Sequence, residues 1–184
     1  MPSSESVLRE IEELSKTEYL PIIGRAKGRL IERLVSERNP CTAVEIGVMV
    51  GYSSILIARN LGDGCKLVGL ELSVDLAQRA EANLAAAGLA SKATILLGDA
   101  RELLSTVRGP IDFALLDAEK TQNLNYLKKL ESIMAPGAII VANGAGLLAA
   151  RMASYLDYVR SSKRYESSVE VFGDDAMEIS IFQG

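Results

Sequence analysis

The sequence predicts an α/β fold built on a doubly wound, mostly parallel sheet with helices on both faces and an antiparallel hairpin near the C-terminus. Three observations lead to this prediction. Short runs rich in Val, Ile and Leu alternate with helical stretches of about ten to fifteen residues, which is typical of βαβ units. The first five runs are largely apolar, as strands buried on both faces are. The last two runs alternate apolar and polar residues, and the turn-forming residues 173–176 join them.

The first forty residues predict a helical cap that precedes the sheet. Ser3 or Ser4 can cap the first helix, and Pro40 closes the segment. Apolar residues recur at the spacing of an amphipathic helix in two stripes, which are Val7, Leu8, Ile11 and Leu14, then Leu30, Ile31, Leu34 and Val35.

Five predicted strands and their intervening helices follow this cap, each strand bounded by Gly, Asp or Pro. No repeat, low-complexity tract or linker interrupts the pattern, so residues 1–184 are expected to form one domain of the Rossmann-like class. Asp174 and Asp175 are expected to form the hairpin turn. The predicted strands are 42–47, 66–72, 93–98, 111–117, 137–143, 167–172 and 177–182, and the predicted helices are 53–61, 74–88, 100–107, 123–134 and 147–160.

Composition and charge exclude several classes of protein. Lys and Arg number 20 against 24 Asp and Glu, and the net charge of −4 disfavours a nucleic-acid partner. No run of about 18 apolar residues occurs, so we expect no membrane span. The N-terminal stretch is acidic and amphipathic rather than apolar, so we expect no secretory signal and a cytoplasmic location.

The chemistry available to the chain is limited, because it contains no His. Serine triads, cysteine–histidine pairs and His-rich zinc sites are therefore excluded. Cys41 and Cys65 are the only cysteines and form no CxxC motif. In a reducing cytoplasm we expect two unpaired core thiols, with a single disulfide as the alternative.

Polar residues stand at the carboxyl end of each predicted parallel strand, where open α/β sheets bind ligands. The first strand runs through Glu45 and Gly47 toward Gly51 and Ser53, at the start of a helix. The glycines let the backbone approach a ligand, and the helix offers free N–H groups. The G-x-x-x-G spacing matches neither the dinucleotide-binding nor the P-loop pattern, and a plain strand-to-helix turn is the alternative.

The next four strand ends carry further polar groups. A carboxylate at Glu71 can accept hydrogen bonds from both hydroxyls of a ribose, and one at Asp99 can accept from an adenine amine. The fourth strand ends in the segment Asp117–Lys120 and the fifth in Asn143. Each residue alone is common at a strand end, but the set together favours a ligand that carries a nucleoside.

In this order the motifs resemble a known family. The succession E-x-G-x-x-x-G-Y-S, then E, then G-D-A, then D-A-x-K resembles the class I S-adenosylmethionine-dependent O-methyltransferases, and in particular their catechol and caffeoyl-coenzyme A branch. The stretch Pro21–Ile31 is similar to the G-D-A-K-G-Q segment of the catechol enzymes. The resemblance covers roughly residues 19–182.

The resemblance implies where S-adenosylmethionine would bind. Ile23 and the turn from Gly47 to Gly51 would line its methionine part. Ser53 would bind its carboxylate group, and Glu45 belongs to the same cofactor-binding motif.

The resemblance also assigns the nucleoside and the reaction. Glu71 would bind the ribose hydroxyls, and Asp99 with Ala100 would bind the adenine. Asp117 would lie beside the sulfonium, and Lys120 would be the base that takes the proton of the acceptor. Acidic groups around a cationic sulfonium are favourable electrostatically, and methyl transfer is mainly a matter of positioning.

One position departs from the family. Its metal site uses the aspartate of D-A-x-K and an Asp-Asn pair after the fifth strand, whereas this chain has Asn143 and Gly144 there. Only Asp117 and Asn143 remain as candidate ligands. Because Mg²⁺ prefers charged oxygen ligands, we expect metal binding to be greatly weakened.

We therefore predict a methyltransferase that uses S-adenosylmethionine, acts on a hydroxyl of a small-molecule acceptor and has a degraded metal site. Two alternatives remain at this point. One is a non-catalytic or regulatory S-adenosylmethionine-binding protein, and the other is an RNA methyltransferase, which would need a basic surface. A homodimer is compatible with the sequence.

Overall fold

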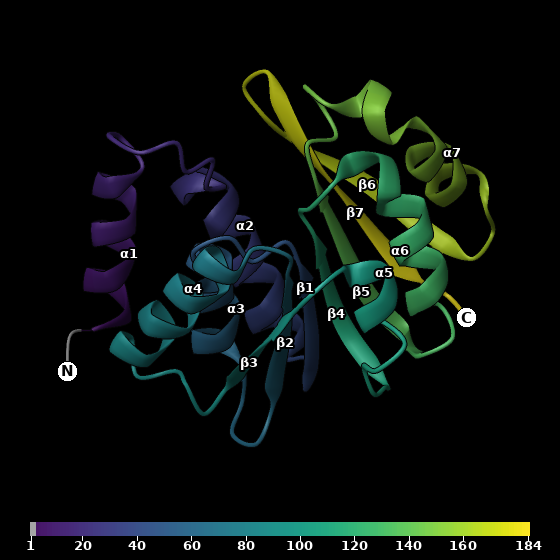
Figure 1. The fold of residues 1–184 in the computed structure, drawn as a ribbon. Helices are drawn as coiled ribbons and strands as arrows, with labels where there is room; N and C mark the ends of the chain where they lie inside the picture. The colour runs from purple at the N-terminus through teal and green to yellow at the C-terminus, as the bar shows by residue number, and fades with distance from the viewer. Residues whose placement is uncertain (1–2) are drawn as a thin grey trace.

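The computed structural model describes residues 3–184 and contains one sheet. The strands are β1 (Thr42–Ile46), β2 (Lys66–Glu71), β3 (Ala93–Leu97), β4 (Ile111–Leu116), β5 (Met134–Asn143), β6 (Tyr165–Phe172) and β7 (Asp175–Phe182). Their order in the sheet is β3-β2-β1-β4-β5-β7-β6 (Figure 1). The strands β1 to β5 are parallel, whereas β7 pairs antiparallel with both β5 and β6. The predicted fold class, including the terminal hairpin, is confirmed.

Helices cover both faces of this sheet (Figure 1). One face carries α1 (Ser4–Leu14), α2 (Gly24–Arg38), α3 (Tyr52–Asn60) and α4 (Val74–Ala86), and the other carries α5 (Ala100–Leu103), α6 (Asn123–Leu130) and α7 (Ala153–Ser161). Two short 3₁₀ turns, η1 (Lys120–Gln122) and η2 (Ala149–Met152), connect strands to α6 and α7. Among the residues described, we find no helix whose length and apolar character would suit a membrane crossing.

The side chains of the central strands alternate between two apolar clusters. Ala43 and Phe113 belong to the cluster under α2 and α3, whereas Val44 and Ala114 belong to the cluster under α6 and α7. All four are at most 1% exposed. Strands buried on both faces explain why their sequences are largely apolar rather than alternating.

The two N-terminal helices of the predicted cap are present. Ser3 caps α1, its Oγ accepting a hydrogen bond from the N–H of Ser6 at 3.2 Å. Charged side chains join α1 to the next helices, because Glu5 accepts hydrogen bonds from both Arg25 of α2 and Arg59 of α3.

The segment after β5 differs from the prediction. A single helix was expected over 147–160, but the chain forms a turn and η2 before α7 begins at Ala153. The N–H groups of Gly146 and Leu147 donate to Oδ1 of Asp175, at 3.3 and 3.1 Å. This contact with β7 holds the turn and delays the start of the helix.

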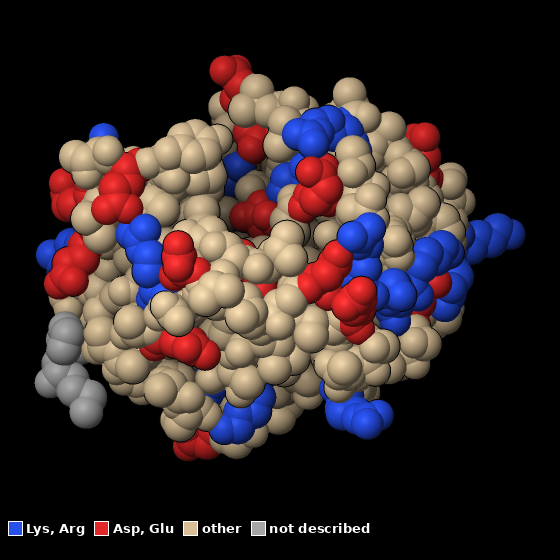
Figure 2. Space-filling view, in the orientation of Figure 1, with Lys and Arg blue, Asp and Glu red and all other residues tan. Residues whose placement is uncertain are grey.

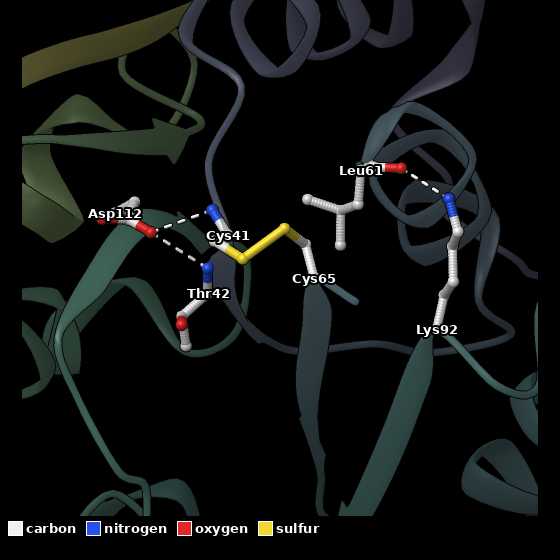
Figure 3. The surroundings of a disulfide bond; sticks show 6 residues. All are labelled: Cys41, Thr42, Leu61, Cys65, Lys92 and Asp112. Carbon is white, nitrogen blue, oxygen red and sulfur yellow. Dashed lines mark hydrogen bonds between the residues drawn. A yellow bond between two sulfur atoms is a disulfide. The ribbon is translucent and has the colours of Figure 1, made fainter. Parts of the chain in front are cut away.

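The prediction of two unpaired core thiols is wrong, because Cys41 and Cys65 form a disulfide (Figure 3). Each cysteine directly precedes a strand, and the parallel register sets Thr42 of β1 opposite Lys66 of β2. The Cα atoms of the two preceding residues consequently lie 4.3 Å apart. Cys41 is also exposed rather than buried in the core.

The disulfide gives a direct prediction for the purified protein. Without reductant, denatured protein should contain no thiol that reacts with Ellman's reagent. The Cys41→Ser/Cys65→Ser variant should lose about 3 kcal/mol of unfolding free energy, because the bond closes a loop in the unfolded chain. Urea unfolding of both proteins measures this difference. Two reactive thiols per chain in the wild type would contradict the bond.

Candidate active site

The carboxyl ends of the five parallel strands surround one cavity of about 540 Å³. Its wall includes Gly47 after β1, Glu71 of β2, Asp99 after β3, Asp117 after β4 and Asn143 of β5. Figure 2 shows a hollow in the middle of this face, with acidic side chains deep inside it and basic side chains at its edge. The volume lies within the range of about 300–1,000 Å³ typical of small-molecule sites.

Most of the predicted site residues share this cavity. Ile23, Ser53, Ala100 and Lys120 line it together with the strand-end residues. Gly51 is not part of the wall. It is the N-cap of α3 and packs against Ala80 of α4.

Gly47 allows the ends of β1 and β4 to approach each other. Its φ is +91°, and a Cβ atom there would lie 2.8 Å from the carbonyl carbon of Asp117 and the nitrogen of Ala118. The N–H of Asp117 donates to the carbonyl of Ile46 at 2.8 Å. A residue with a side chain at position 47 would push Asp117 away from the cavity.

Glu45 lies behind the cavity wall rather than in it. It is fully buried on β1, and the hydroxyls of Ser53 and Ser54 in the first turn of α3 donate to its two carboxylate oxygens. Burial raises the pKa of Glu45 to about 8, although the two serine hydrogen bonds oppose this, and the nearby charges of Asp117 and Glu71 raise it further. Glu45 therefore positions the start of α3.

Glu71 holds the turn that follows β1. Its Oε2 accepts the N–H of Met49 at 2.8 Å, and its Oε1 accepts the N–H groups of Leu72 and Ser73, both at 2.9 Å. Met49 has a φ of +53°, which is costly for a residue with a side chain. The carboxylate of Glu71 stabilises this conformation, and Oε2 retains capacity to accept a further hydrogen bond.

Asp99 is the N-cap of α5 and pairs with a neighbouring arginine. The Nη2 and N–H of Arg101 lie 2.5 Å from Oδ2 and 2.8 Å from Oδ1 of Asp99. Hydrogen bonds from the side chain and then the backbone of Arg101 lower the pKa of Asp99. Tyr126 of α6 lines the same part of the cavity.

A chain of five polar side chains begins at the opposite end of the cavity, where Lys120, Asp117 and Asn143 line the wall, and continues behind the wall to Lys27 and Asp175. Lys120 Nζ donates to Asp117 Oδ1 at 2.7 Å, and Asn143 Nδ2 donates to the same oxygen at 2.9 Å. Lys27 Nζ donates to Asn143 Oδ1 at 2.7 Å and also to Asp175 Oδ2. Lys120 is 7% exposed, so the ion pair of Lys120 and Asp117 is largely shielded from solvent.

The donor set at this end does not fit the family's metal ion. The oxygen of Asn143 already accepts a hydrogen bond from an ammonium group, which repels a second cation. Gly144 offers no side chain, and at its φ of +93° a Cβ atom would lie 3.2 Å from Lys120 Cε. Of the two predicted metal ligands, Asp117 and Asn143, only Asp117 carries a charge.

Sequence reasoning missed two members of this chain of side chains. Lys27 was part of the motif on α2 but received no role, and Asp175 was assigned only to the hairpin turn. Instead, Asp175 begins β7 and accepts hydrogen bonds from Lys27 and from three backbone N–H groups. The motif on α2 contains Lys27, but no local signal pairs it with Asp175, which lies 148 positions away.

Comparison with known proteins decides the family. The family model described as "O-methyltransferase" matches residues 2–181. The chain belongs to the O-methyltransferase family. The resemblance stated from the motifs is therefore confirmed at the level of the family.

Named relatives of this chain include both branches suggested by the motifs. Catechol O-methyltransferase of Bos taurus is 27% identical over 172 residues, which cover 89% of this chain and 62% of the bovine protein. The chain thus spans less than two thirds of that relative. Caffeoyl-CoA O-methyltransferase of Stellaria longipes is 25% identical over 187 residues, covering 95% of this chain and 78% of that protein.

Solved structures share the fold of this chain. An O-methyltransferase of Streptomyces achromogenes involved in tomaymycin synthesis, solved in complex with SAM, superimposes with a TM-score of 0.88. The alignment covers 97% of this chain and 90% of that one at 24% sequence identity. The likeness extends over nearly the whole chain and confirms the fold class.

The buried Glu45 predicts a pH dependence of stability. Its folded pKa of about 8 lies above the ordinary value of 4.5, so across this window the folded protein binds a proton that the unfolded chain releases. The free energy of unfolding should therefore fall as pH rises from 4.5 to 8, by at most about 1.4 kcal/mol per pH unit from this group. Glu45→Gln should flatten the profile.

Urea unfolding at pH 5, 6.5 and 8 measures this effect. The exposed Glu81 lies on α4, and Glu81→Gln serves as the matched control that should leave the slope unchanged. Identical pH profiles for the wild type and Glu45→Gln would show that Glu45 ionises as freely in the fold as in the unfolded chain.

Proposed function

We propose that this O-methyltransferase transfers the methyl group of S-adenosylmethionine to a hydroxyl of a small-molecule acceptor. The observation that carries the proposal is the pairing of Lys120 with Asp117 in the same cavity that holds Glu71 at its other end. One end thus offers groups that suit a nucleoside, and the other offers a buried amine beside a carboxylate.

The cavity residues fit the cofactor. The free oxygen capacity of Glu71 suits a ribose, and Asp99 with Ala100 suits an adenine. Ile23 lines the apolar part of the wall, and the first turn of α3, at Ser53, offers backbone N–H groups to a carboxylate. When bound, S-adenosylmethionine supplies an electrophilic methyl group on a positively charged sulfur.

The chain's own groups would prepare the acceptor. Once its own proton has passed to solvent, Lys120 Nζ takes the proton of the acceptor hydroxyl, which makes the oxygen a better nucleophile. Asp117 Oδ1 lies 2.7 Å from Nζ and stabilises the ammonium group that forms. The burial of both side chains strengthens this interaction by excluding water.

The cavity also bears on the class of acceptor. Its wall contains the carboxylates of Glu71, Asp99, Asp117 and Glu119 against the cations of Lys120 and Arg151. Phosphate groups of a nucleic acid would meet this excess of negative charge, so the charge balance supports a small molecule over RNA. The cytoplasmic location and the single domain stay predictions from the sequence, with which a homodimer is compatible.

The proposal is tested by following methyl transfer from labelled S-adenosylmethionine to a panel of phenols and catechols. Product from at least one acceptor supports it. Tight binding of S-adenosylmethionine without transfer to any acceptor would favour the non-catalytic alternative. No calorimetric binding of either S-adenosylmethionine or S-adenosylhomocysteine at millimolar concentration would overturn both.

Glu71→Ala should weaken S-adenosylmethionine binding at least tenfold. A hydrogen bond to a charged group is worth about 1.5–3 kcal/mol, and the substitution removes those made to the ribose. Calorimetry gives the dissociation constant. Because Glu71 also holds Met49, a matched pair of ligands separates the two effects.

Adenosine and 2′-deoxyadenosine provide that pair of ligands. The wild type should prefer adenosine, and Glu71→Ala should bind both weakly and equally. If the variant keeps the preference for the 2′-hydroxyl, the ribose contacts a different residue.

Lys120→Arg should lower kcat by roughly 10²–10⁴-fold, the usual contribution of a general base. Arginine keeps a positive charge near Asp117 but does not accept a proton at neutral pH. Initial rates at saturating S-adenosylmethionine measure the loss, with Lys128→Arg on the exposed side of α6 as the control. A Lys120→Arg protein with near wild-type kcat would remove Lys120 from the role of base.

A further inference from the structure

Lys27 is a buried lysine to which the proposed reaction assigns no part. It lies in the N-terminal half of α2, and its side chain is 12% exposed. Its ammonium group contacts the end of β5 at Asn143 and the start of β7 at Asp175. Three segments far apart in the chain therefore meet at one cation.

Asp175 fixes the position of this cation. Beyond its contact with Lys27, Oδ1 of Asp175 accepts the N–H groups of Gly146, Leu147 and Ala176, at 3.3, 3.1 and 2.8 Å. Burial alone would raise the pKa of Asp175, but the hydrogen bonds from Lys27 and the backbone outweigh it and lower this pKa. The carboxylate is thus held in place from its backbone side and presents Oδ2 to Lys27.

Lys27 in turn determines how the amide of Asn143 is oriented. An ammonium group has only donors, so the amide oxygen must face Lys27 and the amide nitrogen must face away. The nitrogen accordingly donates to Asp117 Oδ1 at 2.9 Å, next to Lys120. The orientation of Asn143, and through it the placement of Asp117, depends on the charge of Lys27 on α2.

The ammonium group of Lys27 also occupies the side-chain oxygens that a divalent cation would need as ligands. Asn143 Oδ1 and Asp175 Oδ2 both bind Lys27, and Gly144 contributes no side chain. Positive charge is therefore supplied at this end of the cavity by the protein itself. Unlike a bound metal ion, which can dissociate into solvent, the ammonium group of Lys27 is covalently attached to the protein.

We propose that Lys27 is a positioning residue for methyl transfer, whose ammonium group orients Asn143 against Asp117 and makes the site independent of a divalent metal ion. This inference rests on the proposed function for its catalytic part. Its metal-binding part does not depend on the proposed function, because it concerns only whether Asn143 and Asp175 bind the Lys27 ammonium group or a metal ion.

The first experiment measures metal binding without activity. Mn²⁺ is titrated into the wild type, Lys27→Met and the surface control Lys16→Met, and free Mn²⁺ is followed by electron paramagnetic resonance. Lys27→Met frees the oxygens of Asn143 and Asp175 and removes a positive charge, so it should bind Mn²⁺ at least tenfold more tightly than the wild type. Lys16 is exposed and pairs with Glu13, and its substitution should change nothing. Equal Mn²⁺ binding by the wild type and Lys27→Met would overturn the inference.

The second experiment measures methyl transfer with Mg²⁺ or with EDTA. The wild type should keep its rate within twofold in EDTA. Lys27→Met should lose at least tenfold in kcat while its KM for S-adenosylmethionine stays within twofold, because Asn143 and Asp117 lose their orientation while the nucleoside end is untouched. Inactivation of the wild type by EDTA, or an unchanged kcat in Lys27→Met, would overturn the inference.

A second variant covers the case in which Lys27→Met does not fold. Asp175→Asn keeps the ammonium group but weakens its anchor, and it should lower kcat at least threefold with the same unchanged KM for S-adenosylmethionine. An unchanged kcat in a folded Asp175→Asn protein would count against the inference. A wild type that binds S-adenosylmethionine but methylates no acceptor would defeat the proposed function alone, since the Mn²⁺ titration still decides which cation the site holds.

Discussion

The parallel pairing of β1 with β2 on one side and β4 on the other is the constraint on which the cavity depends. The strands β2 and β3 lie on one side of β1, and β4 and β5 lie on the other. The loops that follow β1 and β4 therefore leave the sheet in opposite directions and open a space between them. Gly47 stands at this division, and its lack of a side chain lets the ends of β1 and β4 approach within contact. Every acidic group at the strand ends is placed by this arrangement.

The same pairing explains what surrounds the cavity. Because β1 is buried on both faces, Glu45 cannot reach solvent and is satisfied by two serine hydroxyls of α3. The polar interior of the protein is thus continuous with the wall of the cavity at Ser53, which both contacts Glu45 and lines the space. Met49, in the turn between β1 and α3, has a strained positive φ, and its N–H donates to the carboxylate of Glu71. Backbone strain therefore occurs next to the groups that face the ligand.

Local patterns in the sequence were sufficient for the fold and for the strand-end residues. Apolar runs and helical stripes act over a few residues, and parallel strands must bring their carboxyl ends to one edge, which predicts Glu71, Asp99 and Asp117 as neighbours of one cavity. The disulfide was also within reach of such reasoning, since Cys41 and Cys65 each precede one of two adjacent parallel strands. It was only the alternative prediction because the expected cellular compartment, rather than strand register, guided the choice.

The roles of Lys27 and Asp175 could not be predicted in this way. Lys27 lies 116 positions from Asn143 and 148 from Asp175, and only the completed sheet with α2 docked on it brings them together. Loop closure over such separations is unfavourable by itself, so these bonds depend on the rest of the fold to hold their partners together. A molecule that has built the β1–β5 sheet but not yet docked both termini would thus have strands without a finished site. The Lys27 contacts are therefore present only in a chain whose helix α2 and C-terminal hairpin have both packed against the sheet.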